Sequence, residues 1–220
     1  MDELPMDGPA DTQARRPFQI LSIDGGGLKG LFSAVVLAEM EDDLDVDLLD
    51  HFDLVAGTSA GGIIALALGK GMRAADIVDF YGQLGAAVFD KPGLGVRTAK
   101  HRAAKLRSAL DTVFGDTILG TSRIPLVIPS FSLDGQGVYI FKTPHSERLK
   151  RDWKVPMVEV AMATSAAPTF LPAFRRGSIR LIDGGVWANN PVVVAIAEAR
   201  SLFGVSLDDV RILSLGTTTD

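Results

Sequence analysis

The 220-residue chain contains no cysteine. Disulfides, thiolate metal sites and cysteine nucleophiles are therefore excluded. A basic excess is also missing, because 22 Lys and Arg stand against 27 Asp and Glu and give a formal net charge of -5. Binding to nucleic acid by counterion release depends on a basic excess. We therefore expect no nucleic-acid partner.

Long hydrophobic runs are absent as well. The apolar stretch at residues 63–68 is far shorter than the roughly 20 residues that a membrane-spanning helix needs. The N-terminus is acidic and proline-bearing, without the cationic and apolar regions of a signal peptide. We expect residues 1–17 to form a disordered arm, residues 18–220 to form one domain, and the chain to lie in the cytoplasm.

Short apolar runs alternate along the chain with helical patterns. Residues 18–23 and 54–58 are predicted strands, and each leads through glycine into a helix. Further strands are expected near residues 126–133, 138–142, 179–182 and 210–215, and helices near 74–114 (broken at 91–93), 157–166 and after 191. This order predicts an α/β domain with a mostly parallel central sheet and helices on both faces.

Three consecutive glycines follow the first strand, within the sequence Asp-Gly-Gly-Gly-Leu-Lys-Gly at residues 24–30. The pattern satisfies G-x-G-x-x-G, but a dinucleotide site also needs an acidic residue after the second strand, and a P-loop needs Lys-Ser/Thr after its last glycine. Neither is present. A tight turn is one interpretation. The other is that the amides of Gly25, Gly26 and Gly27 face an anion or oxyanion at a helix N-terminus.

Ser59 stands in the pattern Gly57-x-Ser59-x-Gly61, between a predicted strand and a predicted helix. This context is typical of a nucleophilic serine lifted above a sheet on a strained turn. The alternative is a serine that only caps the following helix.

A base for this serine is harder to find among the histidines. The order serine, acid, histidine is excluded because the three histidines are His51, His101 and His145, all before the acid candidate. His145 is kept as a minor alternative base. Asp183 ends an apolar run and precedes Gly184 and Gly185, which places a carboxylate at a strand end where it can take the serine proton. An Asx-turn is the structural alternative.

The three motifs together occur in the order and spacing of the patatin-like phospholipases, which the chain resembles from residue 18 to residue 220. The resemblance implies a three-layer fold and a phospholipase A type lipid acyl hydrolase without cofactor or metal. By this resemblance Ser59 is the nucleophile of a Ser–Asp dyad with Asp183, and an acyl-enzyme forms. The amides of Gly25, Gly26 and Gly27 form the oxyanion hole, and the supporting motif residues are Gly57, Gly61, Lys29, Gly184 and Gly185.

Two departures from the family pattern are visible. Lys29 stands where the family more often carries arginine, so the positive charge is retained but the bidentate fork of a guanidinium is not. Family members generally continue beyond the strand at residues 210–215, so we expect the family's C-terminal helices to be missing.

A narrower resemblance involves residues 141–145, 151–154 and 163–170, which are similar to bacterial patatin-like effectors of the CBASS antiphage type. It implies activation by a cyclic dinucleotide, with Lys142, His145 and Arg151 as candidate contacts, and peripheral contact with phospholipids of the inner membrane. An exposed charged loop is the alternative for these three residues. A soluble esterase or thioesterase with the same dyad and an inactive nucleotide-sensing module remain alternatives for the whole chain.

Overall fold

The computed structural model describes residues 16–88 and 96–217. The arm predicted at residues 1–17 therefore lies outside the described residues except for its last two. The helix break predicted at residues 91–93 lies outside them entirely.

The central sheet contains a block of four parallel strands. The order is β7-β1-β2-β3. The bounds are β1 (Phe18–Ile23), β2 (Leu54–Gly57), β3 (Leu126–Ser132) and β7 (Val210–Leu215). All of β2 is buried, as expected for a strand with helices on both sides. This half of the sheet matches the predicted parallel arrangement.

The other half of the sheet is antiparallel, which corrects the prediction of a mostly parallel sheet. It contains β4 (Gly137–Lys142), β5 (Phe174–Arg176) and β6 (Ile179–Asp183). Both β4 and β6 pair antiparallel with β3, and β5 pairs antiparallel with β6. Short turns join β3 to β4 and β5 to β6, so each of these pairs reverses direction without the crossover that a parallel neighbour needs. A longer segment that includes residues 157–164 separates β4 from β5.

Strands β2 and β6 approach each other along one edge of β3. Val127 pairs with both β2 and β4, and Ser130 pairs with both β4 and β6. Because β4 takes one edge of β3, β2 and β6 share the other. They run in opposite directions, so the end of β2 at Gly57 and the end of β6 at Asp183 converge beside the middle of β3. This convergence brings the residues that follow β2 close to the end of β6.

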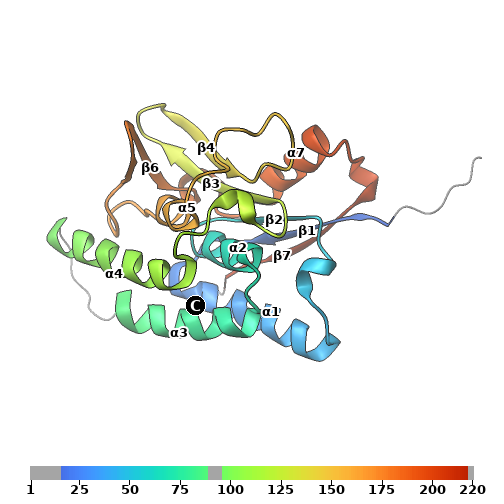
Figure 1. Ribbon diagram of the computed structural model, residues 1–220, viewed down its shortest axis with the longest axis horizontal. Coiled ribbons are helices and arrows are strands. Elements are labelled where there is room, and N and C mark those ends of the chain that lie inside the picture. Colours follow the sequence, from blue (N-terminus) through green and yellow to red (C-terminus); the bar gives the residue numbers. More distant parts are fainter. Residues whose placement is uncertain (1–15, 89–95, 218–220) are drawn as a thin grey trace, which may run out of the picture.

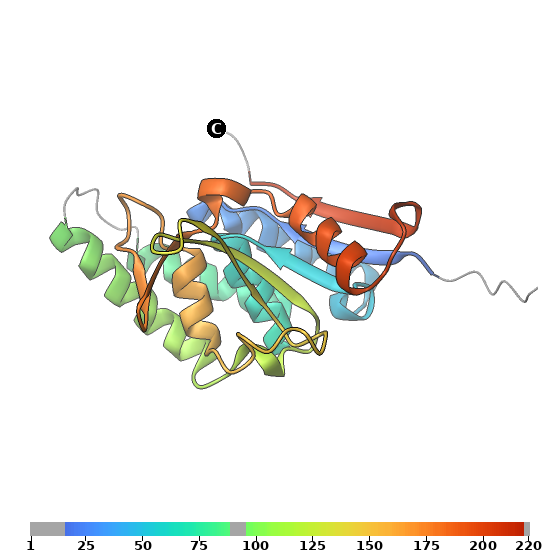
Figure 2. The same cartoon turned by 90° about the horizontal axis from the view of Figure 1, so that it is seen from above.

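Helices cover both faces of the sheet, as predicted (Figure 1). One face carries α1 (Gly30–Leu44), α2 (Ala60–Lys70), α3 (Ala74–Val88), α4 (Val96–Phe114) and α5 (Met157–Thr164). The other carries α7 (Val192–Leu202), whose Ala195 and Ala199 pack on β1, β2 and β3. Figure 2 shows α7 against the parallel end of the sheet, far from α4. Short elements complete the fold: α6 (Gly185–Ala188) and the 3-10 helices η1 (Gly27–Lys29), η2 (Leu48–Asp50), η3 (Leu119–Thr121) and η4 (Leu207–Asp209).

Helix α2 is the central helix of the larger core. Every residue from Ala60 to Gly69 is buried. The helix, including its N-terminus after Ser59, is therefore held in place by packing against its neighbours. Among the described helices, none combines the length and the apolar character needed to cross a bilayer.

Candidate active site

Ser59 lies on a strained turn between β2 and α2. Its backbone has φ 55° and ψ -119°, a region that is costly for a residue with a side chain. It occupies the N-cap position of α2, yet its hydroxyl makes no capping hydrogen bond. The helix-cap interpretation of Ser59 is therefore wrong, and the hydroxyl is directed to another partner.

The two glycines of the serine motif allow the close approach of strand and helix at this turn. A Cβ at Gly57 would overlap the Gly61 carbonyl, and a Cβ at Gly61 would overlap the Ile23 carbonyl. Only glycine fits at these two backbone crossings. The sequence pattern around Ser59 thus has a direct steric cause.

Asp183 is the partner of the serine hydroxyl. Ser59 Oγ donates to Asp183 Oδ2 at 2.7 Å, while the Gly185 amide donates to Asp183 Oδ1 at 2.7 Å. The Asp183 residue is only 5% exposed. Burial raises the pKa of Asp183, although the hydrogen bonds from Ser59 and Gly185 partly oppose this. A raised pKa makes the carboxylate a stronger base toward the serine proton.

The three consecutive glycines do not all present free amides. The Gly25 amide donates to the Asn189 carbonyl at 3.0 Å, so the prediction that Gly25 supplies an oxyanion donor does not fit this conformation. In the described chain the amides of Gly26 and Gly27 donate to no protein acceptor. Gly27 has φ +59°, a left-handed conformation that glycine adopts without strain. Gly26 and Gly27 are therefore the better candidate donors.

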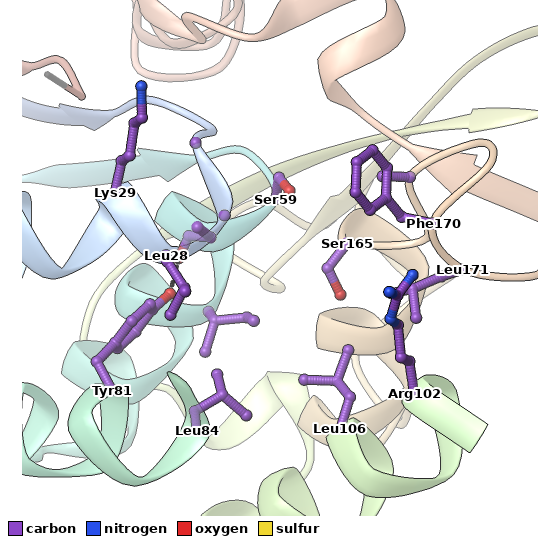
Figure 3. A pocket seen from close by; sticks show the side chains of 15 residues that line it. Leu28, Lys29, Ser59, Tyr81, Leu84, Arg102, Leu106, Ser165, Phe170 and Leu171 are labelled. Carbon is purple, nitrogen blue, oxygen red and sulfur yellow. Dashed lines mark hydrogen bonds between the residues drawn. The ribbon is translucent and has the colours of Figure 1, made fainter. Parts of the chain in front are cut away.

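A largely apolar cavity of about 440 Å³ opens beside Ser59 and these two glycines. Leu28, Ser59, Ser165 and Phe170 lie around one end of the cavity in Figure 3, and Leu84 and Leu106 lie at the other. Ala60, Ile63, Tyr81, Arg102, Ala167, Leu171 and Lys29 complete the lining. The Tyr81 hydroxyl donates to the Ala60 carbonyl at 2.6 Å, which removes its polar end from the cavity. Such a cavity suits a hydrocarbon chain.

The remaining motif residues have structural roles around this site. Lys29 is exposed at the edge of the cavity. A Cβ at Gly184 would overlap the Pro129 carbonyl of β3, so glycine is required where β6 ends. Gly185 supplies the amide that orients Asp183.

The three candidate nucleotide contacts are held by carboxylates of the same chain. Lys142 Nζ and His145 Nε2 bind the two oxygens of Glu198, at 2.5 and 2.9 Å. Arg151 binds the carboxylate of Asp152 and lies over the Tyr139 ring. The three side chains therefore do not form a free basic cluster in this conformation. His145 contacts Glu198 and not Ser59, whose hydroxyl donates to Asp183.

Two residues at the site were not found by sequence reasoning. Thr164 accepts the Ser59 amide with its hydroxyl, and the Asn189 side chain donates to the Gly25 carbonyl. Thr164 lies in a segment, residues 163–170, whose resemblance to a known family is given above. A hydrogen bond across more than 100 residues, however, has no local sequence signal. No group of three or more His, Asp or Glu side chains suited to a metal ion occurs within the described ranges.

Comparisons with known proteins agree with this geometry. A family model described as patatin-like phospholipase matches residues 21–196. A cGAMP-activated phospholipase of Pseudomonas aeruginosa is 35% identical over 210 residues, covering 92% of this chain and 63% of the relative. Another, from Escherichia coli, is 33% identical over 219 residues, covering 90% and 62%. The chain spans less than two thirds of either relative.

A solved structure shares the fold. VipD from Legionella pneumophila superimposes with a TM-score of 0.57 at 13% sequence identity, over 90% of this chain and 50% of VipD. At this identity the likeness concerns the fold alone.

Proposed function

Because the chain belongs to the patatin-like phospholipase family, we propose that it hydrolyses acyl esters of membrane phospholipids with Ser59 as nucleophile and Asp183 as base. The observation that carries this proposal is the 2.7 Å hydrogen bond from Ser59 Oγ to a buried carboxylate at the end of an apolar cavity. A nucleophile, its base and a space for the acyl chain are thus next to one another.

Acylation begins when Ser59 Oγ attacks the ester carbonyl and its proton passes to Asp183 Oδ2. The carbonyl oxygen gains negative charge within reach of the Gly26 and Gly27 amides, whose hydrogen bonds stabilise it. The ester bond then breaks, the departing alcohol takes the proton from Asp183, and the acyl group stays on Ser59.

Deacylation repeats these steps with water. Water gives a proton to Asp183 as its oxygen attacks the acyl-serine, and the same amides hold the second oxyanion. Asp183 returns the proton to Ser59 when the fatty acid leaves. One carboxylate therefore acts as base and acid in both halves, and no histidine is needed.

The proposed activator is a cyclic dinucleotide. The support is the name of the two relatives, cGAMP-activated phospholipase, at 33–35% identity over at least 90% of this chain. Lys142, His145 and Arg151 already contact carboxylates, so nucleotide binding there would first require these contacts to open. We therefore expect contacts elsewhere or a rearrangement of this region.

The test is fatty-acid release from mixed phospholipid vesicles by wild type, Ser59→Ala and Asp183→Asn, each with and without cGAMP. We expect release by wild type, stimulation by cGAMP, and loss of at least about 10²-fold in both variants. Release from short monomeric esters but not from vesicles would favour an esterase or thioesterase. Nucleotide binding with equal, background-level hydrolysis in wild type and Ser59→Ala would favour a non-catalytic sensor.

A further inference from the structure

We propose that Thr164, the last residue of α5, is a positioning residue that holds Ser59 and Asp183 in contact. The inference rests on the proposed function, in which these two residues form the dyad. Thr164 itself touches neither reacting oxygen, and it acts through the backbone on both sides of the dyad.

The hydroxyl of Thr164 connects the nucleophile turn to the sheet. The Ser59 amide donates to Thr164 Oγ1 at 3.0 Å, and the Thr164 hydroxyl donates to the Pro129 carbonyl of β3 at 2.6 Å. The Thr164 residue is fully buried. The Ser59 amide and the buried Pro129 carbonyl are therefore both satisfied by one hydroxyl.

The carbonyl of Thr164 connects the same residue to the other half of the dyad. It accepts the Gly184 amide at 3.2 Å, directly after Asp183, and the Asp183 amide donates to Ala166 two residues further on. Thr164 is thus bonded to the backbone of Ser59 by its side chain and to the segment of Asp183 by its main chain. The relative position of β2 and β6, which converge on β3, depends on this shared residue.

Strain at Ser59 explains why such an anchor is needed. A positive φ at a non-glycine residue persists only where surrounding contacts hold it. The hydrogen bond to Thr164 is such a contact at the Ser59 amide itself. Without it the turn can relax, and the Ser59 hydroxyl moves relative to Asp183. The bond also shows that the Ser59 amide is occupied and cannot serve as an oxyanion donor in this arrangement.

Thr164→Val is the direct test, because valine keeps the branched shape and lacks the hydroxyl. We expect kcat for a p-nitrophenyl ester to fall about 10²-fold, the loss typical of a misplacement of about 1 Å, with KM nearly unchanged. Thr164→Ser keeps the hydroxyl, so kcat should stay within about threefold of wild type. Unchanged kcat in Thr164→Val, or an equal loss in both variants, would overturn the proposal.

Thr143→Val is the matched control for stability. Thr143 is also buried, its Oγ1 accepts the Leu126 amide at 2.9 Å, and it contacts a second group, His145 Nδ1, at 2.8 Å. It lies beside the first residue of β3, whereas the dyad lies beside Ser130 further along the strand. Thr143→Val should lower Tm as Thr164→Val does and leave kcat unchanged. Equal losses of kcat in the two valine variants would mean that Thr164 acts only through stability.

Labelling with a fluorophosphonate separates this inference from the question of substrate. Ser59 Oγ attacks phosphorus, fluoride leaves, and the serine proton passes to Asp183, so no lipid is involved. We expect rapid labelling of wild type and of Thr164→Ser, and labelling of Thr164→Val slowed about 10²-fold. This result supports the role of Thr164 even if vesicles are not hydrolysed. Equal labelling of wild type and Thr164→Val, or no labelling of wild type at Ser59, would overturn it.

Discussion

Asn189 and Gly25 are joined by two hydrogen bonds that connect the glycine loop to the segment after α6. The Gly25 amide donates to the Asn189 carbonyl at 3.0 Å, and Asn189 Nδ2 donates to the Gly25 carbonyl at 3.2 Å. The next two residues, Gly26 and Gly27, line the cavity, and within the described chain their amides donate to no protein acceptor. The orientation of the proposed oxyanion donors therefore depends on Asn189, which lies 164 residues away in the chain.

Asn189→Asp should lower kcat with little change in KM. A carboxylate cannot donate to the Gly25 carbonyl, so the glycine loop loses one of its two bonds to this segment. Removal of an oxyanion donor costs about 10²–10³ in rate, and a donor that is displaced rather than removed should cost less, about 10-fold. Steady-state hydrolysis of a p-nitrophenyl ester measures the effect.

Asn190→Ala is the control for that experiment. Asn190 Oδ1 accepts the Val192 amide at the start of α7, and its Nδ2 donates to Ser214. Loss of these hydrogen bonds costs about 1 kcal/mol of stability and should leave kcat unchanged. An equal fall of kcat in Asn189→Asp and Asn190→Ala would contradict a specific role for Asn189.

The pH dependence of hydrolysis should show an acidic limb set by Asp183. The base must be ionised, and burial raises the pKa of Asp183 above its ordinary value of 3.8. Activity should therefore be lost as the pH falls through this raised pKa, and kcat/KM measured against pH locates the limb. His145→Ala should leave the limb in place, since His145 binds Glu198 rather than Ser59. A limb that moves or disappears in His145→Ala would refute the carboxylate as the sole base.

The same raised pKa has a consequence for stability. A carboxyl group whose pKa is higher in the folded than in the unfolded protein lowers the free energy of unfolding once the pH exceeds the unfolded pKa. Asp183→Asn removes that cost, and an asparagine can still accept the Gly185 amide. We therefore expect a higher Tm for Asp183→Asn than for wild type at neutral pH, together with lost activity. A lower Tm at neutral pH would show that the charged form of Asp183 is favoured by the fold.

The sequence predicted the elements that carry the dyad, because their signals are local. The strands that precede Ser59 and contain Asp183 lie at Leu54–Gly57 and Ile179–Asp183, each within one residue of the predicted bounds, and the two side chains meet as expected. The direction of β6 was not predictable in the same way. A strand of five residues has the same apolar pattern whichever way it runs, and its pairing with β3 depends on distant contacts.

Long-range hydrogen bonds account for the other differences. The occupied amide of Gly25 depends on Asn189, and the pairing of Lys142 and His145 depends on Glu198, more than 50 residues later. Helix α6 has only four residues, too few for a helical period to show. These features follow from tertiary packing, and no residue pattern within a short window encodes them.

The length of the acyl chain should be limited by the end of the cavity at Leu84 and Leu106 (Figure 3). Leu106→Trp fills this end without touching Ser59. We expect kcat/KM for a p-nitrophenyl palmitate to fall at least about 10-fold, since each methylene that loses its place in an apolar pocket costs about 1–3 kcal/mol. The butyrate ester, which does not reach this end, should be hydrolysed at nearly the wild-type rate.

Lys105→Trp is the control for Leu106→Trp, because it places an equally large side chain on the same helix. Lys105 is exposed and lines a different hollow, between α3 and α4. It should leave the ratio of palmitate to butyrate hydrolysis unchanged. If Leu106→Trp also leaves this ratio unchanged, the cavity does not hold the acyl chain.

Glu198 should matter for stability rather than for catalysis. Burial alone would raise the pKa of Glu198, but hydrogen bonds from His145 and Lys142 outweigh it and hold the pKa below its usual 4.5. Glu198→Gln leaves the Lys142 and His145 side chains without a carboxylate partner. We expect the free energy of unfolding to fall by about 3 kcal/mol at neutral pH, the lower end of the range for a broken buried pair, because the Lys142 side chain remains 23% exposed. Urea unfolding measures this loss, and kcat should not change.

The pH dependence of that loss distinguishes an ion pair from a packing effect. A carboxylate with a lowered pKa stabilises the fold above its unfolded pKa, and this contribution disappears as the pH falls through the folded value. The difference between wild type and Glu198→Gln should therefore shrink at acidic pH. Glu159→Gln is the control, since Glu159 pairs with Arg176 at 3.4 Å where both side chains are about one third exposed, and it should cost no more than about 1 kcal/mol. A Glu198→Gln deficit that stays constant with pH would mean that shape, and not charge, holds α7 to the end of β4.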